Sequence, residues 1–187
     1  MDEGNAMQII HKGGKSYPAA LADRLGSEAP RQLTALGNID LLNLPKAALF
    51  CSAKCPGSAI LAAYDQAARW RDSGQCVISG FHSPIEKECL SILLRGAQPI
   101  IICPARGIET MRVPGDWKAP LAAGRLLILS PFGATHRRVT ADLAARRNEL
   151  VAALADEAWF AHITPGGQAE RLTKLLAKWQ IPFSIAG

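Results

Sequence analysis

The sequence predicts an α/β protein with a Rossmann-like, doubly wound and mostly parallel sheet that carries helices on both faces. From residue 47 onward, short apolar runs alternate with longer stretches of helical character. These runs are apolar at nearly every position rather than at every second one, as burial on both faces of a sheet requires. Strands and helices that alternate in this way are typical of a parallel sheet with helical crossovers.

The individual elements follow from the same pattern and from the residues that bound them. The predicted strands cover 47–51, 76–79, 99–103, 126–130, 158–163 and 181–185. The predicted helices cover 58–72, 84–95, 117–123, 140–155 and 167–179. Glycines follow three of these helices, at Gly74, Gly96 and Gly124, and glycine is the preferred residue just after a helix end. Ser83 and Pro84 begin the second helix as its N-cap and first residue.

The chain divides into a short extension and one main domain. Residues 1–45 contain the turn-forming pairs Gly13-Gly14 and Tyr17-Pro18 and no long periodic segment. We expect them to form an N-terminal extension packed on a Rossmann-like domain of residues 46–187. A chain of 187 residues is long enough to bury a sizeable core.

Charge and hydropathy indicate the kind of partner. The net charge is +5 and the pI is about 9.1, which suits a polyanionic partner. No apolar run approaches the roughly 20 residues needed to cross a bilayer. The acidic segment Met1-Asp2-Glu3 lacks the basic-then-apolar order of a signal peptide. We therefore expect a cytoplasmic protein with no membrane partner.

The side chains that could bind a metal or perform catalysis form no complete set. Cys51 and Cys55 have C-x₃-C spacing, but no second pair of ligands completes a zinc site. Cys51, Cys76 and Cys103 lie in or beside apolar runs and are better interpreted as small core residues. Glu170 has no second carboxylate to pair with as an acid or base. We expect no metal, no cofactor and no catalytic residue, so the sequence favours a binding protein over an enzyme.

The most informative segment follows the predicted strand 76–79. Ser83-x-x-Glu86 is a capping box, which explains these two residues without any ligand. The preceding residues lie at the carboxyl end of a parallel strand, where open α/β proteins bind ligands. We predict that they contact a sugar hydroxyl or the edge of a phosphate. These candidate contacts are Ser79, Gly80, Phe81 and His82.

A second turn of this kind follows the predicted strand 158–163. Pro165-Gly166-Gly167 permits close approach of the backbone to a ligand, because glycine lacks a Cβ atom. A tight turn without a ligand is the alternative. We predict that the two turns face each other in one shared site.

Basic residues are concentrated near the predicted helix 140–155. Arg137, Arg138, Arg146 and Arg147 fall within eleven residues, with Asp142 as the single acid between them. Arg146 and Arg147 lie at the edge of the stripe that we expect to be buried, which comprises Leu143, Leu150, Val151 and Leu154. Either arginine could pair with a phosphate in bidentate fashion. The alternative is a surface arginine whose aliphatic stem packs on the helix.

Several segments together resemble the DprA/Smf DNA-processing proteins. Ile78-Ser79-Gly80-x-x-Ser83-x-Ile85-Glu86 resembles the V-S-G-x-A-x-G-I-D segment of that family. Arg146-Arg147-Asn148 begins a stretch similar to its R-R-N-R-x-I-A-x-L-S segment, and Tyr17-Pro18-x-x-Leu21 is similar to its Y-P-x-x-L segment. The matches occur in order and extend from about Tyr17 to the end of the chain.

The resemblance implies an extended Rossmann-like fold and a cytoplasmic protein that binds single-stranded DNA. It also implies a homodimer that helps to load a RecA-type recombinase. Lys54 stands one residue after the position at which the family carries an arginine. The contact positions that the resemblance implies are Ser52, Ser79, Gly80, Arg146, Arg147, Asn148, Gly166 and Gly167. We add Lys54 and Pro165 as candidate contacts.

A second function remains open at the second turn. Pro165-Gly166-Gly167 also looks like the P-G-G turn of the LOG-type, lysine-decarboxylase-like phosphoribohydrolases. That resemblance implies a nucleotide-binding sensor, or an enzyme that releases the base from nucleoside monophosphates. Such a protein would use the same strand ends.

Overall fold

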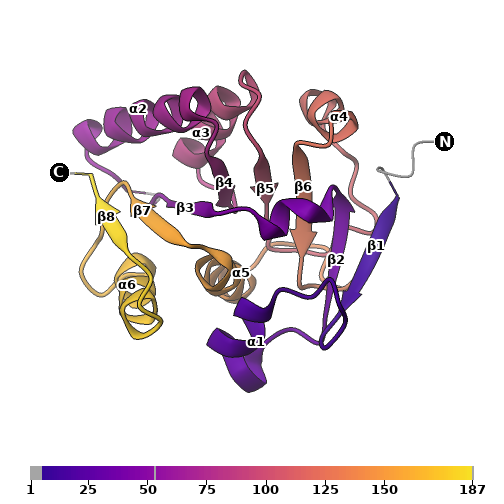
Figure 1. Ribbon diagram of the computed structural model, residues 1–187. Coiled ribbons are helices and arrows are strands. Elements are labelled where there is room, and N and C mark those ends of the chain that lie inside the picture. The colour runs from indigo at the N-terminus through magenta and orange to yellow at the C-terminus, as the bar shows by residue number, and fades with distance from the viewer. Residues whose placement is uncertain (1–5, 53, 187) are drawn as a thin grey trace.

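The computed structural model describes residues 6–52 and 54–186, which form one eight-stranded sheet with helices on both faces (Figure 1). The strands are β1 (Met7–His11), β2 (Gln32–Gly37), β3 (Lys46–Phe50), β4 (Cys76–Ser79), β5 (Ile100–Ile102), β6 (Leu126–Ser130), β7 (Glu157–Phe160) and β8 (Phe183–Ile185). The helices are α1 (Ala19–Leu25), α2 (Gly57–Ser73), α3 (Pro84–Leu94), α4 (Gly115–Ala122), α5 (Ala141–Leu154) and α6 (Gln168–Lys178), with 3₁₀ turns η2 (Gly26–Glu28) and η3 (Ile39–Asn43). This architecture confirms the predicted Rossmann-like fold.

The strand order is β1-β2-β6-β5-β4-β3-β7-β8. The strands from β6 to β8 in this order are parallel, and the chain reverses its direction of travel across the sheet between β3 and β7. Such a reversal opens a crevice at the carboxyl ends of the strands, where ligands of this fold class bind. At the other edge, β1 and β2 pair antiparallel beside β6. The expected extension therefore contributes two strands to the same sheet.

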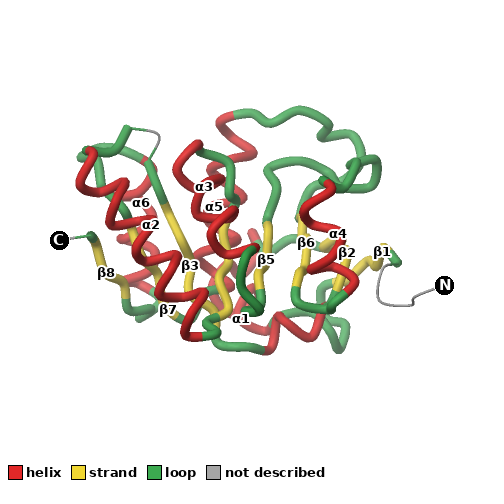
Figure 2. The backbone as a smooth tube through the Cα atoms, turned by 90° about the horizontal axis from the view of Figure 1, so that it is seen from above, coloured by secondary structure: helices red, strands yellow, loops and turns green. Residues whose placement is uncertain are grey.

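Two apolar layers enclose the sheet. Helices α2, α3 and α4 cover one face, and α1, α5 and α6 cover the other (Figures 1 and 2). Successive residues of β3 alternate between the layers: Ala47 and Leu49 pack with the first set of helices, and Ala48 and Phe50 with the second. Burial on both faces explains why the strands are uniformly apolar.

The predicted boundaries agree closely with the structure. The strands at 76–79 and 126–130 match residue for residue, and each of the five predicted helices begins and ends within two residues of the observed one. The strand predicted at 158–163 was too long, because β7 ends at Phe160. Ala161 and Ile163 still pack on the apolar clusters, so their apolar character reflects burial in a loop. Within the described residues, no helix has the length and hydropathy to cross a membrane.

Candidate nucleic-acid interface

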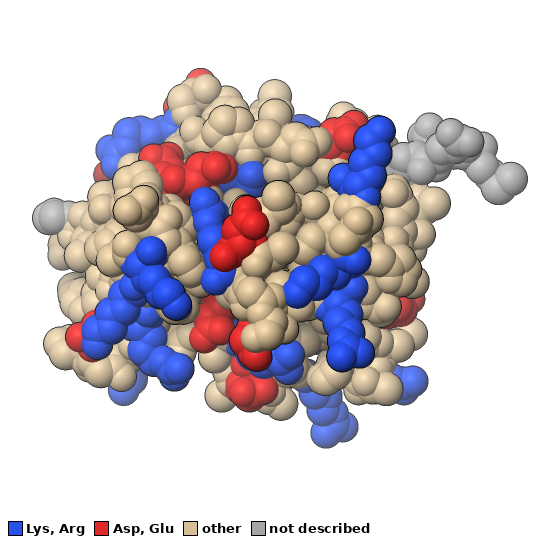
Figure 3. Space-filling model, turned by 60° about the horizontal axis from the view of Figure 1, so that its bottom comes forward, with Lys and Arg blue, Asp and Glu red and all other residues tan. Residues whose placement is uncertain are grey.

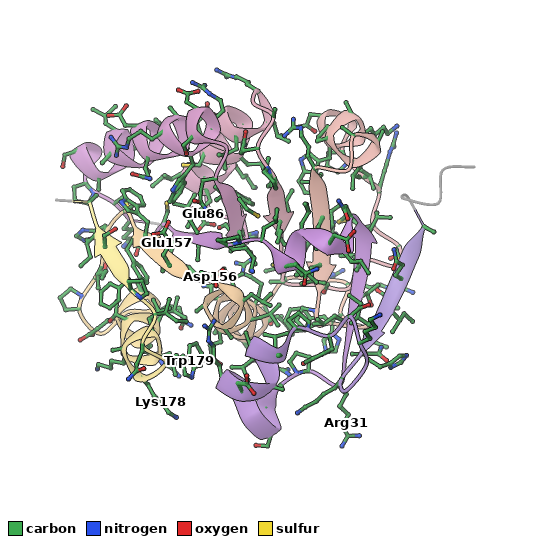
Figure 4. All side chains as sticks on the ribbon, viewed as in Figure 1. Arg31, Glu86, Asp156, Glu157, Lys178 and Trp179 are labelled. Carbon is green, nitrogen blue, oxygen red and sulfur yellow. The ribbon has the colours of Figure 1, made fainter. Side chains whose placement is uncertain are left out.

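The turn after β4 is held by the carboxylate of Glu86. The predicted capping box is present: Ser83 Oγ accepts a hydrogen bond from the Glu86 backbone N–H at 3.2 Å, and Glu86 Oε2 accepts from the Ser83 backbone N–H at 3.2 Å. Oε2 also accepts from the His82 N–H at 2.9 Å, and Oε1 accepts from the Cys51 N–H at 3.1 Å. Figure 4 shows Glu86 in the interior beside β3. One buried carboxylate therefore ties the ends of β3 and β4 together.

Ser79 shapes this turn from within. Its hydroxyl donates to the Leu49 carbonyl at 2.8 Å and accepts from the Phe81 N–H at 3.3 Å, and the residue is 1% exposed. Phe81 adopts a left-handed backbone conformation with φ of 46°, which is rare for a bulky residue and typical of functional turns. The Ser79 side chain thus supports the turn, and the surface that a ligand could reach lies at Gly80 and beyond.

Arg147 is the central charged group at this edge. It is 4% exposed, its Nη1 donates to the Cys103 carbonyl at 2.9 Å, and its Nε donates to Asn148 Oδ1 at 2.7 Å. Its guanidinium lies directly on Gly80, where a Cβ atom would overlap it. Burial lowers the pKa of Arg147, and the negative charge of Glu86 opposes this shift. An arginine nevertheless stays protonated in proteins.

No carboxylate of the described residues forms an ion pair with Arg147. The ion pairs among these residues join Lys46 to Asp156, Arg71 to Asp72 and Lys174 to Glu170. A buried cation is costly unless an anion accompanies it. Arg147 also lines an open cavity. This arrangement makes Arg147 a candidate contact for an anion.

The cavity has a volume of about 490 Å³ and lies beyond the ends of β4 and β5, within the range of about 300–1,000 Å³ typical of small-molecule sites. Figure 2 shows the long loops that follow β5 and β6 at this edge of the sheet. The charged residues that line the cavity are Lys87, Arg106, Arg137, Arg147 and Asp116. Four cations and one acid give the lining a positive charge. The larger apolar residues of the lining are Phe81, Leu90, Leu94, Ile102, Met111, Trp117 and Val139.

Arg146 lies elsewhere, because successive residues of a helix point about 100° apart. It is exposed, and its guanidinium carbon lies 5.8 Å from the centre of the Phe132 ring. It lines a different cavity of about 420 Å³, together with Arg31, Glu28 and Glu149. Figure 3 shows basic and acidic side chains interspersed on the side of the molecule that carries α1 and α6, and Figure 4 shows Arg31 pointing outward there.

The second turn is closed by its own contacts. The Gly166 backbone N–H donates to Glu170 Oε2 at 2.6 Å, and the Gly167 N–H donates to the Thr164 carbonyl at 3.0 Å. Gly166 has φ of 72°, a left-handed conformation that glycine adopts without strain. Ser52 Oγ donates to the His162 carbonyl at 3.1 Å, which joins the ends of β3 and β7. The tight-turn interpretation thus accounts for both glycines.

The cavity brings together four of the predicted contact residues: Gly80, Phe81, His82 and Arg147. The other predicted contact residues are not part of its lining; they are Ser52, Lys54, Ser79, Arg146, Asn148, Pro165, Gly166 and Gly167. Sequence reasoning overlooked Lys87, Arg106 and Asp116. A signal for Arg106 was available, because it follows the predicted strand 99–103 by three residues and so belongs to the same carboxyl edge.

Among residues 6–52 and 54–186, no group of three or more His, Cys, Asp or Glu side chains is placed to hold a metal ion. All five cysteines are free thiols. The pKa of Cys51 is raised, first by a hydrogen bond with Cys89 and then by burial.

The fold and the cavity define a Rossmann-like protein with a positively charged cavity at the strand ends, and solved structures share this fold. DNA processing protein A from Helicobacter pylori is 19% identical with a TM-score of 0.76, over 99% of this chain and 82% of that one. The corresponding protein from Streptococcus pneumoniae is 20% identical with a TM-score of 0.72, over 92% of this chain and 62% of that one. A molybdenum cofactor binding protein from Rippkaea orientalis is 12% identical with a TM-score of 0.54, over 75% of each chain.

The profile of the DNA recombination-mediator protein A family matches residues 8–162. The chain therefore belongs to this family, the DprA family of DNA-processing proteins. Among curated proteins, no relative matches at a significant level.

Proposed function

We propose that this protein binds single-stranded DNA through phosphate contacts at the carboxyl edge of its sheet. The observation that carries this proposal is Arg147, a buried guanidinium that lines a cavity and forms no ion pair with a described carboxylate. A phosphate oxygen adds a negative charge next to Arg147, beyond that of the nearby Glu86 carboxylate, and accepts a charge-assisted hydrogen bond. Lys87, Arg106 and Arg137 line the same cavity and attract a polyanion to it.

Family membership supports the same ligand. The similar protein from Helicobacter pylori binds single-stranded DNA. In this chain Gly80 lets the Arg147 guanidinium lie against the turn after β4, since any side chain there would overlap it. Gly80 and Arg147 therefore pack against each other, and both residues line the same cavity.

The test is a fluorescence-polarisation titration of a short oligothymidylate at several salt concentrations. Phosphate binding releases counterions, so log K should fall linearly with log[salt], by about 0.7 for each phosphate contacted. Arg106→Ala and Arg137→Ala should each weaken binding and reduce that slope by about 0.7.

Arg69→Ala is the matched control, because Arg69 is exposed on α2 and contacts Gln66 rather than the cavity. It should leave the slope unchanged. Affinity that is insensitive to salt, or an absence of binding at low salt, would contradict the proposal.

A finer proposal concerns the role of the protein once the strand is bound. We propose that the protein acts in the cytoplasm as a homodimer and loads a RecA-type recombinase onto the bound strand; the family's description as recombination mediators supports the last part. Light scattering coupled to size exclusion should then give twice the mass of the 20.0 kDa chain. Adding the protein to recombinase and protein-coated single-stranded DNA should shorten the lag before recombinase ATP hydrolysis begins. A monomeric mass would contradict the homodimer. An unchanged lag would contradict the role in loading the recombinase.

A further inference from the structure

A second cavity lies between the N-terminal segment and α5. Its walls come mainly from the chain between α1 and β2 and from α5, and α1 and α5 cover the same face of the sheet (Figure 1). Its volume is about 420 Å³, within the usual range of small-molecule sites. None of its lining residues also lines the larger cavity described above. The two cavities are therefore separate sites.

The charges that line this second cavity cancel. They belong to two arginines and two glutamates, which are Glu28, Arg31, Arg146 and Glu149. Among the described residues, none of these four side chains forms an ion pair. The larger cavity has four cations and one acid, whereas a phosphate in the second cavity would meet two carboxylates. The second cavity therefore suits a ligand whose own positive and negative charges balance.

Arg146 and Glu149 are spaced to bind two opposite charges of one small molecule. They lie three residues apart on α5, so they are neighbours on the same face of the helix. The Arg146 guanidinium lies 5.8 Å from the centre of the Phe132 ring, within the range of a cation–π contact. Its planar fork matches a carboxylate, and the Glu149 carboxylate accepts hydrogen bonds from an ammonium group. An α-amino acid carries both groups on one carbon atom.

The cavity also has apolar surface. Leu25, Pro30 and Pro131 line it and are each half-buried, so part of each is accessible to a ligand. An apolar side chain gains free energy when it leaves water for such a surface. Small-molecule sites commonly combine an apolar lining with a few polar groups that orient the ligand. A zwitterion with an apolar side chain satisfies both parts of the lining.

We propose that this second cavity binds a free amino acid with an apolar side chain. Its carboxylate binds at Arg146, its ammonium group at Glu149, and its side chain packs on Leu25, Pro30 and Pro131. The inference does not depend on DNA binding, because the two cavities share no lining residue.

The first experiment measures thermal unfolding of the wild-type protein with each of the common amino acids at millimolar concentration. A ligand that binds only the folded state raises the unfolding temperature as its concentration rises. Leucine should do so, and glycine and glutamate should not. N-acetylleucine lacks the ammonium group and leucinamide lacks the carboxylate, so each should bind at least roughly 10-fold more weakly than leucine. No shift with any apolar amino acid, or equal binding of the two derivatives and leucine, would overturn the inference.

The second experiment assigns the two charged contacts by calorimetric titration. Arg146→Gln and Glu149→Gln should each weaken leucine binding roughly 10- to 150-fold, as expected for the loss of a hydrogen bond between charged groups. Arg146→Gln should not weaken leucinamide further, and Glu149→Gln should not weaken N-acetylleucine further, because each derivative already lacks the group concerned. A structural defect would weaken all three ligands alike and so contradict the assignment.

The matched controls are Arg171→Gln and Glu88→Gln. Both side chains are exposed, on α6 and α3, and neither lines either cavity. Both variants should bind leucine as the wild type does. A loss in these variants equal to that in Arg146→Gln and Glu149→Gln would show that net charge, rather than this cavity, governs binding, and would overturn the inference.

The third experiment separates this site from the proposed DNA site. Leucine should bind with the same affinity in the presence of a saturating oligothymidylate. If the oligothymidylate displaces leucine, the second cavity belongs to the path of the strand and the inference is overturned. If leucine binds but no oligonucleotide does, the amino-acid site stands and the proposed function fails. If only the oligonucleotide binds, the proposed function stands and this inference is overturned.

Discussion

At the scale of single residues, the contact between Gly80 and Arg147 fixes where the guanidinium lies. The guanidinium of Arg147 fills the space next to Gly80 and is held there by the Cys103 carbonyl and by Asn148. Because interiors are close-packed, the two positions cannot change independently. Asn148 therefore helps to position Arg147.

Gly80→Ala should displace the Arg147 side chain, because the new methyl group would overlap the guanidinium. We expect a loss of stability of about 1–3 kcal/mol, as for other overpacked sites, together with a marked loss of affinity for single-stranded DNA. Urea denaturation and polarisation titration measure the two effects. Gly57→Ala is the control, since a Cβ there meets no atom within 4 Å. Unchanged affinity in Gly80→Ala would show that Arg147 does not hold the ligand.

The cysteines give a prediction that depends on pH. Burial raises the pKa of Cys76 and of Cys103 to about 12 in each case, and the thiolate is the reactive form. At pH 8 only about one in ten thousand of such thiols is ionised. Half-buried Cys55, whose pKa is also raised by burial, is the most accessible cysteine. Iodoacetamide at pH 8 should therefore add a single group at Cys55, as read by mass spectrometry, and five groups in urea. Rapid labelling of Cys103 in the native protein would contradict this.

At the scale of elements, α5 shows what the sequence could and could not predict. Its boundaries were predicted to within one residue, and its buried stripe of Leu143, Leu150, Val151 and Leu154 was predicted correctly, because periodicity alone defines that stripe. The same periodicity placed Arg146 and Arg147 together at the edge of that stripe. In the fold, Arg147 is buried against Gly80 and the Cys103 carbonyl, and Arg146, about 100° around the helix, is exposed.

The candidate site was predictable to the same limited degree. The capping box at Ser83 and Glu86 follows from a local motif, and the structure confirms it. Met111 and Trp117 come from a loop and from α4, outside any motif, and the fold alone brings them to the turn after β4. No local sequence motif indicates that these residues lie near the turn after β4, because their position depends on how the crossover helices and loops pack.

The N-terminus of α5 gives a prediction at this scale. Thr140 caps the helix, since its Oγ1 accepts a hydrogen bond from the Leu143 N–H at 3.2 Å. Thr140→Ala should lower the free energy of unfolding by about 0.5–2 kcal/mol. Thr135→Ala, in the exposed loop before it, should change it by less than about 0.5 kcal/mol. Equal effects in urea denaturation would mean that the cap does not stabilise α5.

At the scale of the whole molecule, the first two strands join the sheet as its antiparallel edge. β2 pairs with β6 from Thr34, opposite Ser130, to Gly37, opposite Leu127. Ile10 of β1 and Leu33 of β2 belong to the same apolar cluster as α5 and α6. Residues 7–37 and the main domain therefore share one core, and we expect them to unfold together.

Neighbouring isoleucines of β1 test this directly. Ile10 is 5% exposed and packs in the shared core, whereas Ile9 is 56% exposed on the other face of the strand. Ile10→Ala should cost about 2–5 kcal/mol, the usual range for removing a buried aliphatic side chain, and Ile9→Ala less than about 0.5 kcal/mol. Thermal unfolding of Ile10→Ala, followed by calorimetry, should remain a single transition at a lower temperature, because one core is weakened throughout. A separate transition at lower temperature, with the main transition at the wild-type midpoint, would contradict this prediction. It would mean that residues 7–37 unfold independently of the main domain.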